Sequence, residues 1–505
     1  MGNFEYPAKL NVAKELIDNN TAKRGDKVFI YTAKEEITFN QLSERVNKFA
    51  NVLKGLGVNP GERVMIVLPD IPLFYCAFLG SIKAGAIPIP INNALKEDDY
   101  KFLLNDSEAS VLITTSDNEA KNSSSTSLKH KLLAETDIPA LLKKAGSDFA
   151  AYPSKEDDIA FWLYSSGSTG KPKGVLHRHR DILFTADTFA KSVVNLTDKD
   201  IVFSASKLFF AYGLGNSLSF PLRFGASVVI LDDKPSPENV IDLLSKYKPT
   251  VFCGVPTLFN SMLKRMGELN LKFLRICISA GEALPPEIYR KWLKATGLEL
   301  LDGIGSTEAL HIFISNMPNA VKENSTGKLV PGYEARVIDD ENNDVPEGEQ
   351  GHLIIRGKSV TPGYWKRPSD NEEKMMPDGW FKTGDMYSME DGYFYYQGRG
   401  DDMLKVGGIW VSPMEIENIF LSHQAVHECA VVGSKVEGLV KPFAYVVLNS
   451  GEDKNKDKAK DLLSFAQSKL PKHKWPWEVY FIDALPRTTT GKVQRFKLRQ
   501  TAPVR

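Results

Sequence analysis

The amino-acid sequence predicts an α/β protein with a large N-terminal domain of βαβ subdomains plus a small β-rich subdomain, followed by a small α/β C-terminal domain. Three observations predict this class. Strand and helix patterns alternate from the N-terminus onward, which favours parallel sheets. Residues 327–400 are dense in strand patterns, and residues 402–505 form a separate run of strands and helices. With 505 residues the chain is too long for one hydrophobic core, so several domains or subdomains are expected.

The composition is that of an ordinary globular protein, and it argues against several functional classes. Lys plus Arg equals Asp plus Glu at 63 each, so no strongly basic surface for nucleic acid is indicated. The four cysteines are far apart without metal-site spacing, which is typical of buried thiols in a reducing compartment. The N-terminus lacks a signal-peptide pattern, and no apolar run is long enough to span a bilayer. We therefore expect a cytoplasmic protein with neither a nucleic-acid nor a membrane partner.

The N-terminal segment follows the βαβ pattern. Apolar residues at helical spacing begin after Thr38 and stop at Gly55 and Gly57, which predicts a helix that ends there. The apolar run 63–68 predicts a buried strand, residues 74–84 a helix, and residues 86–91 the next strand. Residues 114–131 are rich in Ser, Asn and Lys, so we expect a surface loop there.

A loop rich in glycine and hydroxyl side chains, residues 164–174, follows the strand pattern of residues 159–163. Such a loop presents backbone N–H groups that bind anions, and its hydroxyls and lysines add the donors and charge that a polyphosphate needs. The Walker pattern does not fit, because Gly167 and Gly170 lie too close together and Pro172 follows Lys171. Taken alone, the stretch could also be a solvated linker. As a phosphate loop it offers Ser165, Ser166, Gly167, Ser168, Thr169, Gly170, Lys171 and Lys173.

A further strand pattern ends in candidate binding residues, because residues 274–278 run into Gly281 and Glu282. Ligands of α/β sheets bind at the carboxyl ends of strands, so this turn is a candidate nucleotide contact.

The pair His177 and His179 lies just after the glycine-rich loop. A metal site is one interpretation, but an H-x-H pair without further ligands is a weak signal. We favour a polar strand end beside the loop.

A second glycine-rich stretch, residues 398–408, lies between the strand-rich segment 327–400 and the α/β unit of residues 402–505. Ser412 is predicted to cap the helix that follows, with Glu415 three residues further on. Near the end, the sequence T-G-K at residues 490–492 would be a surface turn if it stood alone.

In their order along the chain, the motifs from Tyr164 to Lys492 resemble the adenylate-forming superfamily, which comprises acyl-CoA synthetases, adenylation domains and firefly-type luciferases. The wording of residues 209–216, FFAYGLGN, is similar to that of benzoate-CoA ligases and their aryl-acid relatives. Two positions depart from the usual pattern. Ile304 stands where the superfamily usually has an aromatic residue beside adenine, and the benzoate-CoA ligase branch shares this departure. Gly407-Gly408 replaces the usual Ser-Gly.

The resemblance implies a role for each motif. The catalytic residues would be Lys492, Lys405, Thr307 and Glu308, with Glu308 on Mg²⁺. Asp401 would be the hinge between an N-terminal domain of residues 1–400 and a mobile C-terminal domain of residues 401–505, and Gly400 beside it can absorb backbone rotation. ATP or AMP would be bound by the loop residues given above and by Gly281, Glu282, Asp302, Gly303, Ile304, Thr307, Asp385 and Arg399. The acyl pocket would comprise Ala211, Tyr212, Gly213, Gly303, Ile304, His311 and Ile312. Coenzyme A would be bound by Gly407, Gly408 and Trp410.

The implied activity is an AMP-forming carboxylate-CoA ligase that uses ATP, Mg²⁺ and coenzyme A, with benzoate or a close aryl acid as substrate. Its partners would be these small molecules, and the protein would be a monomer or homodimer. One alternative is an adenylation protein for a medium-chain or cyclic acid, loaded onto coenzyme A or a carrier. No carrier segment follows Lys492, so that carrier would be a separate protein. An alternative of another class is a non-catalytic nucleotide-binding protein, which would not need Lys492. The absence of Walker motifs disfavours a kinase or ATPase.

Overall fold

The computed structural model describes residues 4–166, 172–265, 271–406, 409–436, 439–487 and 493–501, with only the backbone at Ser166, Ile409 and Trp410. The chain divides into two compact units. The large unit contains residues up to Glu334 together with Arg356–Phe381, and the small unit contains Ala335–Ile355 together with the residues from Lys382 onward. The predicted boundary between residues 400 and 401 stays a prediction. Each unit is described by itself below.

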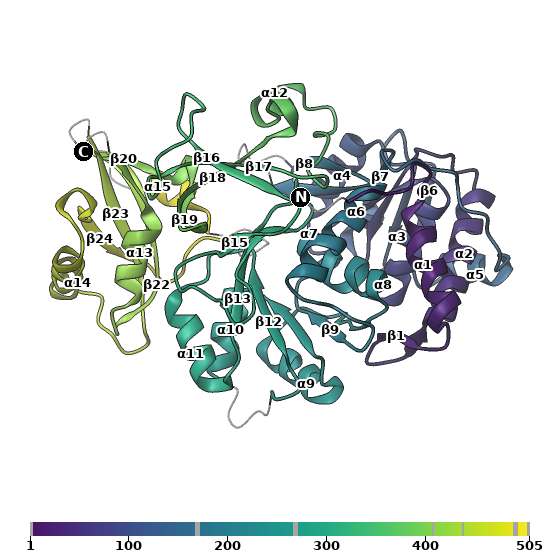
Figure 1. The fold of residues 1–505 in the computed structure, drawn as a ribbon, viewed down its shortest axis with the longest axis horizontal. Helices are drawn as coiled ribbons and strands as arrows, with labels where there is room; N and C mark the ends of the chain where they lie inside the picture. Colours follow the sequence, from purple (N-terminus) through teal and green to yellow (C-terminus); the bar gives the residue numbers. More distant parts are fainter. Residues whose placement is uncertain are drawn as a thin grey trace. The chain divides into compact units, whose positions relative to one another are not determined.

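A nine-stranded sheet is the largest element of the large unit (Figure 1). Its six central strands run parallel, whereas β2, β14 and β15 pair antiparallel at the two edges. In spatial order the strands are β15 (Lys328–Leu329), β14 (Ile312–Ser315), β13 (Leu300–Gly305), β12 (Ile276–Ala280), β11 (Val251–Gly254), β9 (Ile201–Ser204), β10 (Ser227–Val229), β1 (Val28–Tyr31) and β2 (Glu36–Thr38). The parallel centre is the βαβ arrangement that the alternating sequence patterns predict.

A second, all-parallel sheet and a separate hairpin complete the strands of the large unit. The sheet has the order β4 (Ile87–Pro90), β3 (Arg63–Val67), β5 (Val111–Thr114) and β6 (His130–Leu133). The hairpin consists of β7 (Ile159–Ser166) and β8 (Pro172–Arg178). The predicted surface loop 114–131 is only partly a loop, because it contains the 3₁₀ turn η1 (Glu119–Asn122) and its last two residues begin β6. Ala120 of that turn is buried, which explains why the polar composition of the segment did not keep it irregular.

The helices of the large unit form two groups along the chain, which Figure 1 shows in purple to blue and in teal to green. Their local signals are those of the sequence: Thr38 caps α2 in a capping box with Gln41, and Pro286 opens α11. The N-terminal group is α1 (Val12–Arg24), α2 (Phe39–Gly55), α3 (Pro72–Lys83), α4 (Glu97–Ser107) and α5 (Asp137–Lys144). The later helices are α6 (His179–Thr185), α7 (Ala211–Leu214), α8 (Phe220–Phe224), α9 (Pro237–Tyr247), α10 (Pro256–Leu263), α11 (Pro286–Thr296) and α12 (Pro368–Lys374), with π turns η2 (Ala186–Ala190) and η3 (Gly215–Ser219) and the 3₁₀ turn η4 (Pro377–Gly379).

The core of the large unit is apolar and rich in aromatic residues. Phe203 and Phe252 of the nine-stranded sheet pack with Phe259 of α10 and Trp292 of α11, and all four are buried. Burial of rings of this size is the main favourable contribution to folding, at about 25 cal/mol per Å² removed from water. This packed core holds the ends of the strands in place and so positions the residues that follow each strand.

The small unit is built from three antiparallel or mixed sheets. The first has the order β16 (Glu334–Ile338), β17 (Gly351–Arg356), β18 (Phe381–Glu390) and β19 (Tyr393–Arg399). The second pairs β20 (Leu404–Val406) with β21 (Ile409–Val411), and the third has the order β22 (Val426–Val436), β23 (Leu439–Leu448) and β24 (Glu478–Phe481). The helical elements are η5 (Gly400–Asp402), α13 (Pro413–Leu421), α14 (Lys456–Lys469), η6 (Lys472–Lys474) and α15 (Arg495–Thr501).

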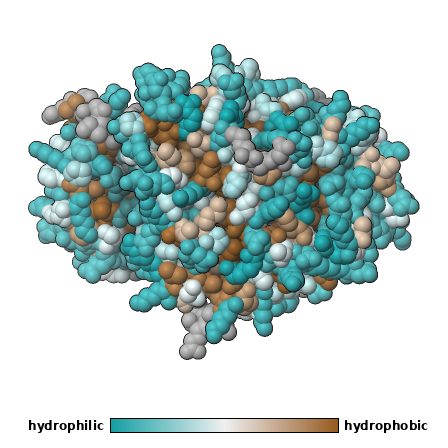
Figure 2. All heavy atoms as spheres, in the orientation of Figure 1, coloured by the Kyte–Doolittle hydropathy of each residue, from teal (hydrophilic) through white to brown (hydrophobic). Residues whose placement is uncertain are grey.

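The predicted serine cap of the C-terminal domain is present. The Ser412 hydroxyl accepts a hydrogen bond of 3.4 Å from the backbone N–H of Glu415 at the start of α13. Figure 2 shows hydrophilic residues over most of the visible face, with smaller apolar areas among them. Across the described ranges, no helix is both long and apolar enough to cross a membrane.

Candidate active site

The hairpin β7–β8 carries the predicted phosphate loop between its strands. Ser165 pairs with Lys173 and Ser166 with Pro172, so the two strands bring both ends of the loop together. The predicted contacts Gly167, Ser168, Thr169, Gly170 and Lys171 lie outside the described residues. The structure therefore describes the two ends of this loop and the residues around them.

The carboxylate of Glu308 lies beside the first of these ends. Its Oε1 atom accepts a hydrogen bond of 3.0 Å from the Tyr364 hydroxyl and one of 3.4 Å from the Ser165 hydroxyl. Among the described residues there is no cluster of three or more His, Cys, Asp or Glu side chains that could bind a metal by itself. One half-buried carboxylate fits a hard cation such as Mg²⁺, which keeps waters and takes its other oxygens from a phosphate substrate.

Lys173, at the other end of the loop, is a buried cation with a partner of its own. Its ammonium forms an ion pair with Asp370 of α12 and lies 5.6 Å from the centre of the Tyr364 ring. Only 7% of the residue is exposed. The pair fastens β8 to α12, while the predicted contact of Lys173 with a nucleotide stays a prediction.

The carboxyl ends of β12 and β13 lie side by side. Ala280 pairs with Gly303 and Ser279 with Asp302, so the turn that begins at Gly281 is adjacent to the end of β13. Gly281 has a φ of +93°, a conformation that residues with a Cβ rarely adopt. Glu282 and the half-buried Ile304 belong to the same sheet edge. The structure thus brings together these predicted nucleotide contacts.

Asp302 carries a carboxyl group in an unusual environment for an acid. Its Oδ1 atom is buried without a hydrogen-bond partner among the described residues. Burial raises the pKa of Asp302 from 3.8 to about 8, although backbone N–H groups of Gly303 and Leu284 oppose the rise. A carboxyl group that is largely protonated at neutral pH can both donate and accept a hydrogen bond.

His311 lies at the centre of a cluster of rings. The ring centroids of Phe220, Phe189 and Tyr212 are 4.5, 5.0 and 5.6 Å from that of His311. His311 is 2% exposed, and neither ring nitrogen makes a hydrogen bond of normal geometry within the described residues. Burial lowers the pKa of His311 from 6.5 to about 3, so the imidazole is neutral at physiological pH.

The remaining predicted acyl-pocket residues lie around this cluster on α7, β13 and β14. The Tyr212 hydroxyl donates a 3.2 Å hydrogen bond to the carbonyl of Ile278, which directs the ring toward the parallel sheet. A Cβ on Gly213 would lie 2.0 Å from the backbone oxygen of Lys207. The backbone that precedes α7 therefore approaches position 213 too closely for any residue other than glycine. The others are Ala211, Gly303, Ile304 and Ile312, of which Ile304 is half-buried and the rest are buried.

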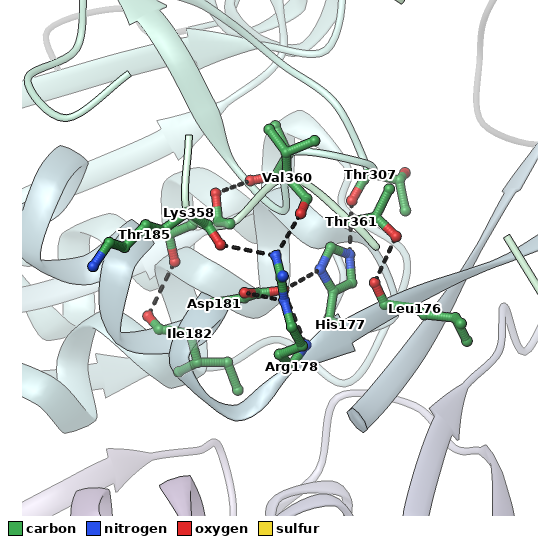
Figure 3. A network of polar contacts seen from close by, with 12 residues as sticks. Leu176, His177, Arg178, Asp181, Ile182, Thr185, Thr307, Lys358, Val360 and Thr361 are labelled. Atoms are coloured by element: carbon green, nitrogen blue, oxygen red, sulfur yellow. Dashed lines mark hydrogen bonds and ion pairs between the residues drawn. The ribbon is translucent and has the colours of Figure 1, made fainter. Parts of the chain in front are cut away.

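Thr307 precedes Glu308 in the turn between β13 and β14, and a histidine holds its backbone. The carbonyl oxygen of Thr307 accepts a 2.9 Å hydrogen bond from Nε2 of His177 (Figure 3). The neighbouring His179 points elsewhere, because its Nδ1 accepts a 3.2 Å hydrogen bond from the backbone N–H of Val12. The two histidines therefore serve different contacts rather than a shared metal.

In the small unit, Asp385 and Arg399 face each other across β18 and β19. They are register partners, and the Arg399 guanidinium donates a 3.0 Å hydrogen bond to the Asp385 carboxylate. Asp385 is 7% exposed, and its backbone N–H donates to the Thr383 hydroxyl at 3.1 Å. Two predicted nucleotide contacts are thus neighbours on one sheet.

The predicted hinge and the residues after it are also in the small unit. Asp401 lies in η5, where its carbonyl accepts a 3.1 Å hydrogen bond from Arg499 of α15. Lys405 is exposed on β20 and pairs in register with Trp410. The predicted contacts Gly407, Gly408 and Lys492 and the side chain of Trp410 lie outside the described residues.

Sequence reasoning missed several residues of this arrangement. It did not identify Tyr364 or Asp370, which are far in sequence from their partners, nor Phe189 and Phe220 around His311. His177 was assigned only to a polar strand end. One signal was present, since His177 and Asp181 are four residues apart across a strand-to-helix junction, but the distant carbonyl could not be predicted.

Comparison with known families gives two matches. The description AMP-binding enzyme matches residues 17–365, and AMP-binding enzyme C-terminal domain matches residues 415–492. A benzoate–CoA ligase of Thauera aromatica is 42% identical over 98% of this chain and 97% of its own. A 4-hydroxybenzoate–CoA/benzoate–CoA ligase of Rhodopseudomonas palustris is 37% identical over 97% of this chain and 94% of its own.

Two solved structures are also similar to this chain. A benzoate CoA ligase from Burkholderia xenovorans LB400 is 40% identical, with a TM-score of 0.89 over 97% of this chain and all of that chain. The anthranilate CoA ligase AuaEII in complex with anthranoyl-AMP is 37% identical, with a TM-score of 0.94 over 99% of each chain.

Proposed function

The chain belongs to the AMP-binding enzyme family and has the adenylate-forming enzyme fold, and from that premise we propose that it is an ATP-dependent, AMP-forming aryl acid–CoA ligase with benzoate as its first candidate substrate. Its partners in the reaction are the carboxylic acid, ATP and coenzyme A. We place it in the cytoplasm, where these co-substrates and the reduced state of its four buried free cysteines are both maintained.

The reaction needs two steps because a carboxylate is a poor acylating agent. In the first step a carboxylate oxygen attacks the α-phosphorus of ATP and pyrophosphate leaves, which gives an acyl-adenylate. In the second step the thiol of coenzyme A attacks the acyl carbon, AMP leaves with the electron pair of the broken C–O bond, and the thiol proton is lost. The first step brings anions together, so its catalysis consists mainly of positioning and charge neutralisation.

In the adenylation step, the described residues of the large unit have separate tasks. Glu308 would hold Mg²⁺, which neutralises phosphate charge when bound, and the Tyr364 and Ser165 hydroxyls keep that carboxylate oriented. Thr307 would donate its hydroxyl to the α-phosphate. Asp302 offers a buried carboxyl oxygen to the amino group of adenine at the sheet edge.

One observation supports an aryl acid as the substrate, namely the neutral and buried His311 among three aromatic rings. Such a wall has no charge to pair with a second carboxylate or an ammonium group of a substrate. Aromatic faces and edges attract another ring, with about 0.5–1.5 kcal/mol beyond the area that is buried. A flat aryl acid therefore fits this wall better than a flexible straight-chain acid, which would lose more rotational freedom on binding.

The second step needs other residues at the same phosphate. We assign Lys405 and the segment Gly407–Gly408 to the thioester-forming arrangement, and Lys492 to adenylation. The exchange requires rotation of the C-terminal domain about Asp401. These assignments rest on the order of the motifs in the sequence.

The test is pyrophosphate release from ATP and Mg²⁺ against a panel of acids, each with and without coenzyme A. Benzoate, 4-hydroxybenzoate, 2-aminobenzoate, cyclohexane carboxylate and hexanoate separate ring planarity from size. We expect release with benzoate to stop after about one turnover without coenzyme A and to continue when it is added. Preference for hexanoate would refute the aryl-acid assignment, and no release with any acid would refute the activity itself.

A further inference from the structure

A buried chain of polar groups runs from α6 through the end of β8 to the turn that contains Thr307. Asp181 Oδ2 lies 3.4 Å from Nδ1 of His177, and Nε2 of the same ring lies 2.9 Å from the carbonyl oxygen of Thr307 (Figure 3). The side chains of both His177 and Asp181 are fully buried. A carbonyl oxygen can only accept, so Nε2 carries the proton and donates it.

The orientation of the His177 ring is fixed on three sides. Its face stacks on Phe161 of β7, with the ring centroids 5.1 Å apart and an angle of 23° between the planes. Asp181 is held in turn by the backbone N–H of Arg178 at 2.9 Å and by its guanidinium at 3.2 Å. The donor that reaches Thr307 is therefore preorganised by its neighbours.

The end of β8 also holds the next carbonyl, that of Glu308. The backbone N–H of Thr361 donates to the Glu308 carbonyl at 2.7 Å, and the Thr361 hydroxyl donates to the Leu176 carbonyl at 2.7 Å. The successive carbonyls of Thr307 and Glu308 are thus connected to the successive β8 residues His177 and Leu176. The strand that continues from the phosphate loop fixes the backbone of both.

We propose that His177, oriented by Asp181, is a positioning residue for adenylation. It sets the Thr307–Glu308 segment at a fixed distance from the β7–β8 hairpin, so that the Thr307 hydroxyl and the Glu308 carboxylate can meet the phosphates of one nucleotide. The inference rests on the proposed function, since it presumes that these two side chains bind phosphate and Mg²⁺. Groups that orient a metal-binding side chain typically contribute about 10- to 100-fold in metal affinity or activity.

Buried space alone does not explain a histidine at this position. A phenylalanine would keep the stacking on Phe161 and would avoid the cost of burying two polar groups, about 1–3 kcal/mol for each that lacks a good partner. The specific feature of histidine is that one ring nitrogen meets the carboxylate while the other meets the carbonyl.

Two amide substitutions test the roles of the two ring nitrogens separately. His177→Gln places an amide N–H where Nε2 is and keeps a donor for Thr307, whereas His177→Asn places it where Nδ1 is and cannot reach that carbonyl. His177→Phe keeps the ring and removes both. The matched control is His179→Phe, another buried histidine two residues away, whose contact is with the N-terminal helix α1.

Four quantities are measured for each variant: the melting temperature, the Mg²⁺ dependence of ATP–pyrophosphate exchange with benzoate, thioester formation from supplied benzoyl-adenylate, and the calorimetric affinity for Mg²⁺-ATP without acid. We expect His177→Asn and His177→Phe to lose about 10- to 100-fold in exchange and to need more Mg²⁺ for half-saturation. Their Mg²⁺-ATP affinity should fall in parallel, and thioester formation should change by less than about twofold, because the lost contact acts only on the adenylation arrangement. His177→Gln should recover most of the exchange, and His179→Phe should lower only the melting temperature.

The outcomes distinguish this inference from the proposed function. If wild-type protein exchanges pyrophosphate but His177→Asn matches His177→Gln, or loses both half-reactions equally, the positioning role is wrong. If the losses follow the melting temperature as they do in His179→Phe, His177 is only structural and the inference is overturned. If wild-type protein shows no acid-dependent exchange while it binds Mg²⁺-ATP, the proposed function fails, and the calorimetric difference between Asn and Gln variants still decides whether His177 positions the site.

Discussion

The carboxyl group of Asp302 should make the stability of the large unit fall as pH rises. Its pKa is raised from 3.8 to about 8 in the folded protein, mainly by burial. Between those two pH values the folded state keeps a proton that the unfolded state has lost. The unfolded state then binds fewer protons, so the free energy of unfolding decreases with pH. The contribution is fully favourable below pH 4 and is lost as pH rises through about 8.

The substitution Asp302→Asn removes this dependence while it keeps the size of the side chain. A shift from 3.8 to about 8 corresponds to about 6 kcal/mol at 1.36 kcal/mol per pKa unit. The residue as a whole is only partly buried, so we allow for screening by solvent and expect about half of that, roughly 3 kcal/mol. Relative to wild type, the variant should therefore gain about 3 kcal/mol in stability between pH 4 and pH 8.

The assay is urea unfolding at 25 °C, followed by tryptophan fluorescence at several pH values from 4.5 to 8. Asp200→Asn is a control of opposite sign. Burial acts to raise the pKa of Asp200, but hydrogen bonds from Arg275 and Thr250 outweigh it and lower the pKa below 3.8. That variant should lose stability at pH 7 and lose less as pH falls toward 4. A difference between Asp302→Asn and wild type that does not change with pH would refute the reasoning.

Three further predictions concern the reaction itself. Lys492→Ala should lose about three decades in adenylation, since one charge at ~4 Å from the phosphate contributes roughly 4 kcal/mol at an effective dielectric constant of about 20. Thioester formation from supplied acyl-adenylate should be spared, and an equal loss in both assays would contradict the role. Asp401→Pro restricts φ at the predicted hinge, so a quenched-flow measurement should find acyl-adenylate that accumulates and is not converted by coenzyme A; normal turnover would exclude the hinge. Gly215→Ala would place a Cβ 2.4 Å from Cδ2 of His311, where carbon atoms normally stay about 3.5–4.0 Å apart. We expect about 1–3 kcal/mol of lost stability by calorimetry and a raised KM for benzoate with an unchanged KM for ATP, and an unchanged benzoate KM would argue against His311 as part of the acyl site.

The positioning of Glu308 connects the proposed reaction with the fold. Its carboxylate belongs to the turn after β13, its hydroxyl donors come from β7 and from the segment that precedes α12, and its backbone carbonyl is bound by Thr361. Three separate parts of the chain thus fix the one carboxylate that we propose as the Mg²⁺ ligand. Because each part is anchored in the core of the large unit, the group is preorganised before a substrate arrives.

Sequence patterns alone predict many of the strands and helices and the candidate residues on them. The apolar run 63–68 predicted β3, Thr38 and Ser412 predicted helix starts, and the order of the glycine-rich and acidic motifs predicted the family. These signals are local: a strand period, a cap or a turn depends on residues within a few positions of each other. For the same reason the polar segment 114–131 was predicted to be a loop throughout, although residues 119–122 form a 3₁₀ turn. The burial of Ala120 in that turn depends on distant neighbours.

Only the tertiary structure decided which of the candidates meet. Tyr364 donates to Glu308 from 56 residues away, His177 reaches the Thr307 carbonyl across 130 residues, and Lys173 pairs with Asp370 across 197. No periodicity or spacing in the sequence encodes such pairs, because they form when helices and sheets pack their apolar faces and bring the ends of distant strands together. The sequence specifies the functional group of each side chain, whereas the partner, the burial and the pKa of that group follow from the packing.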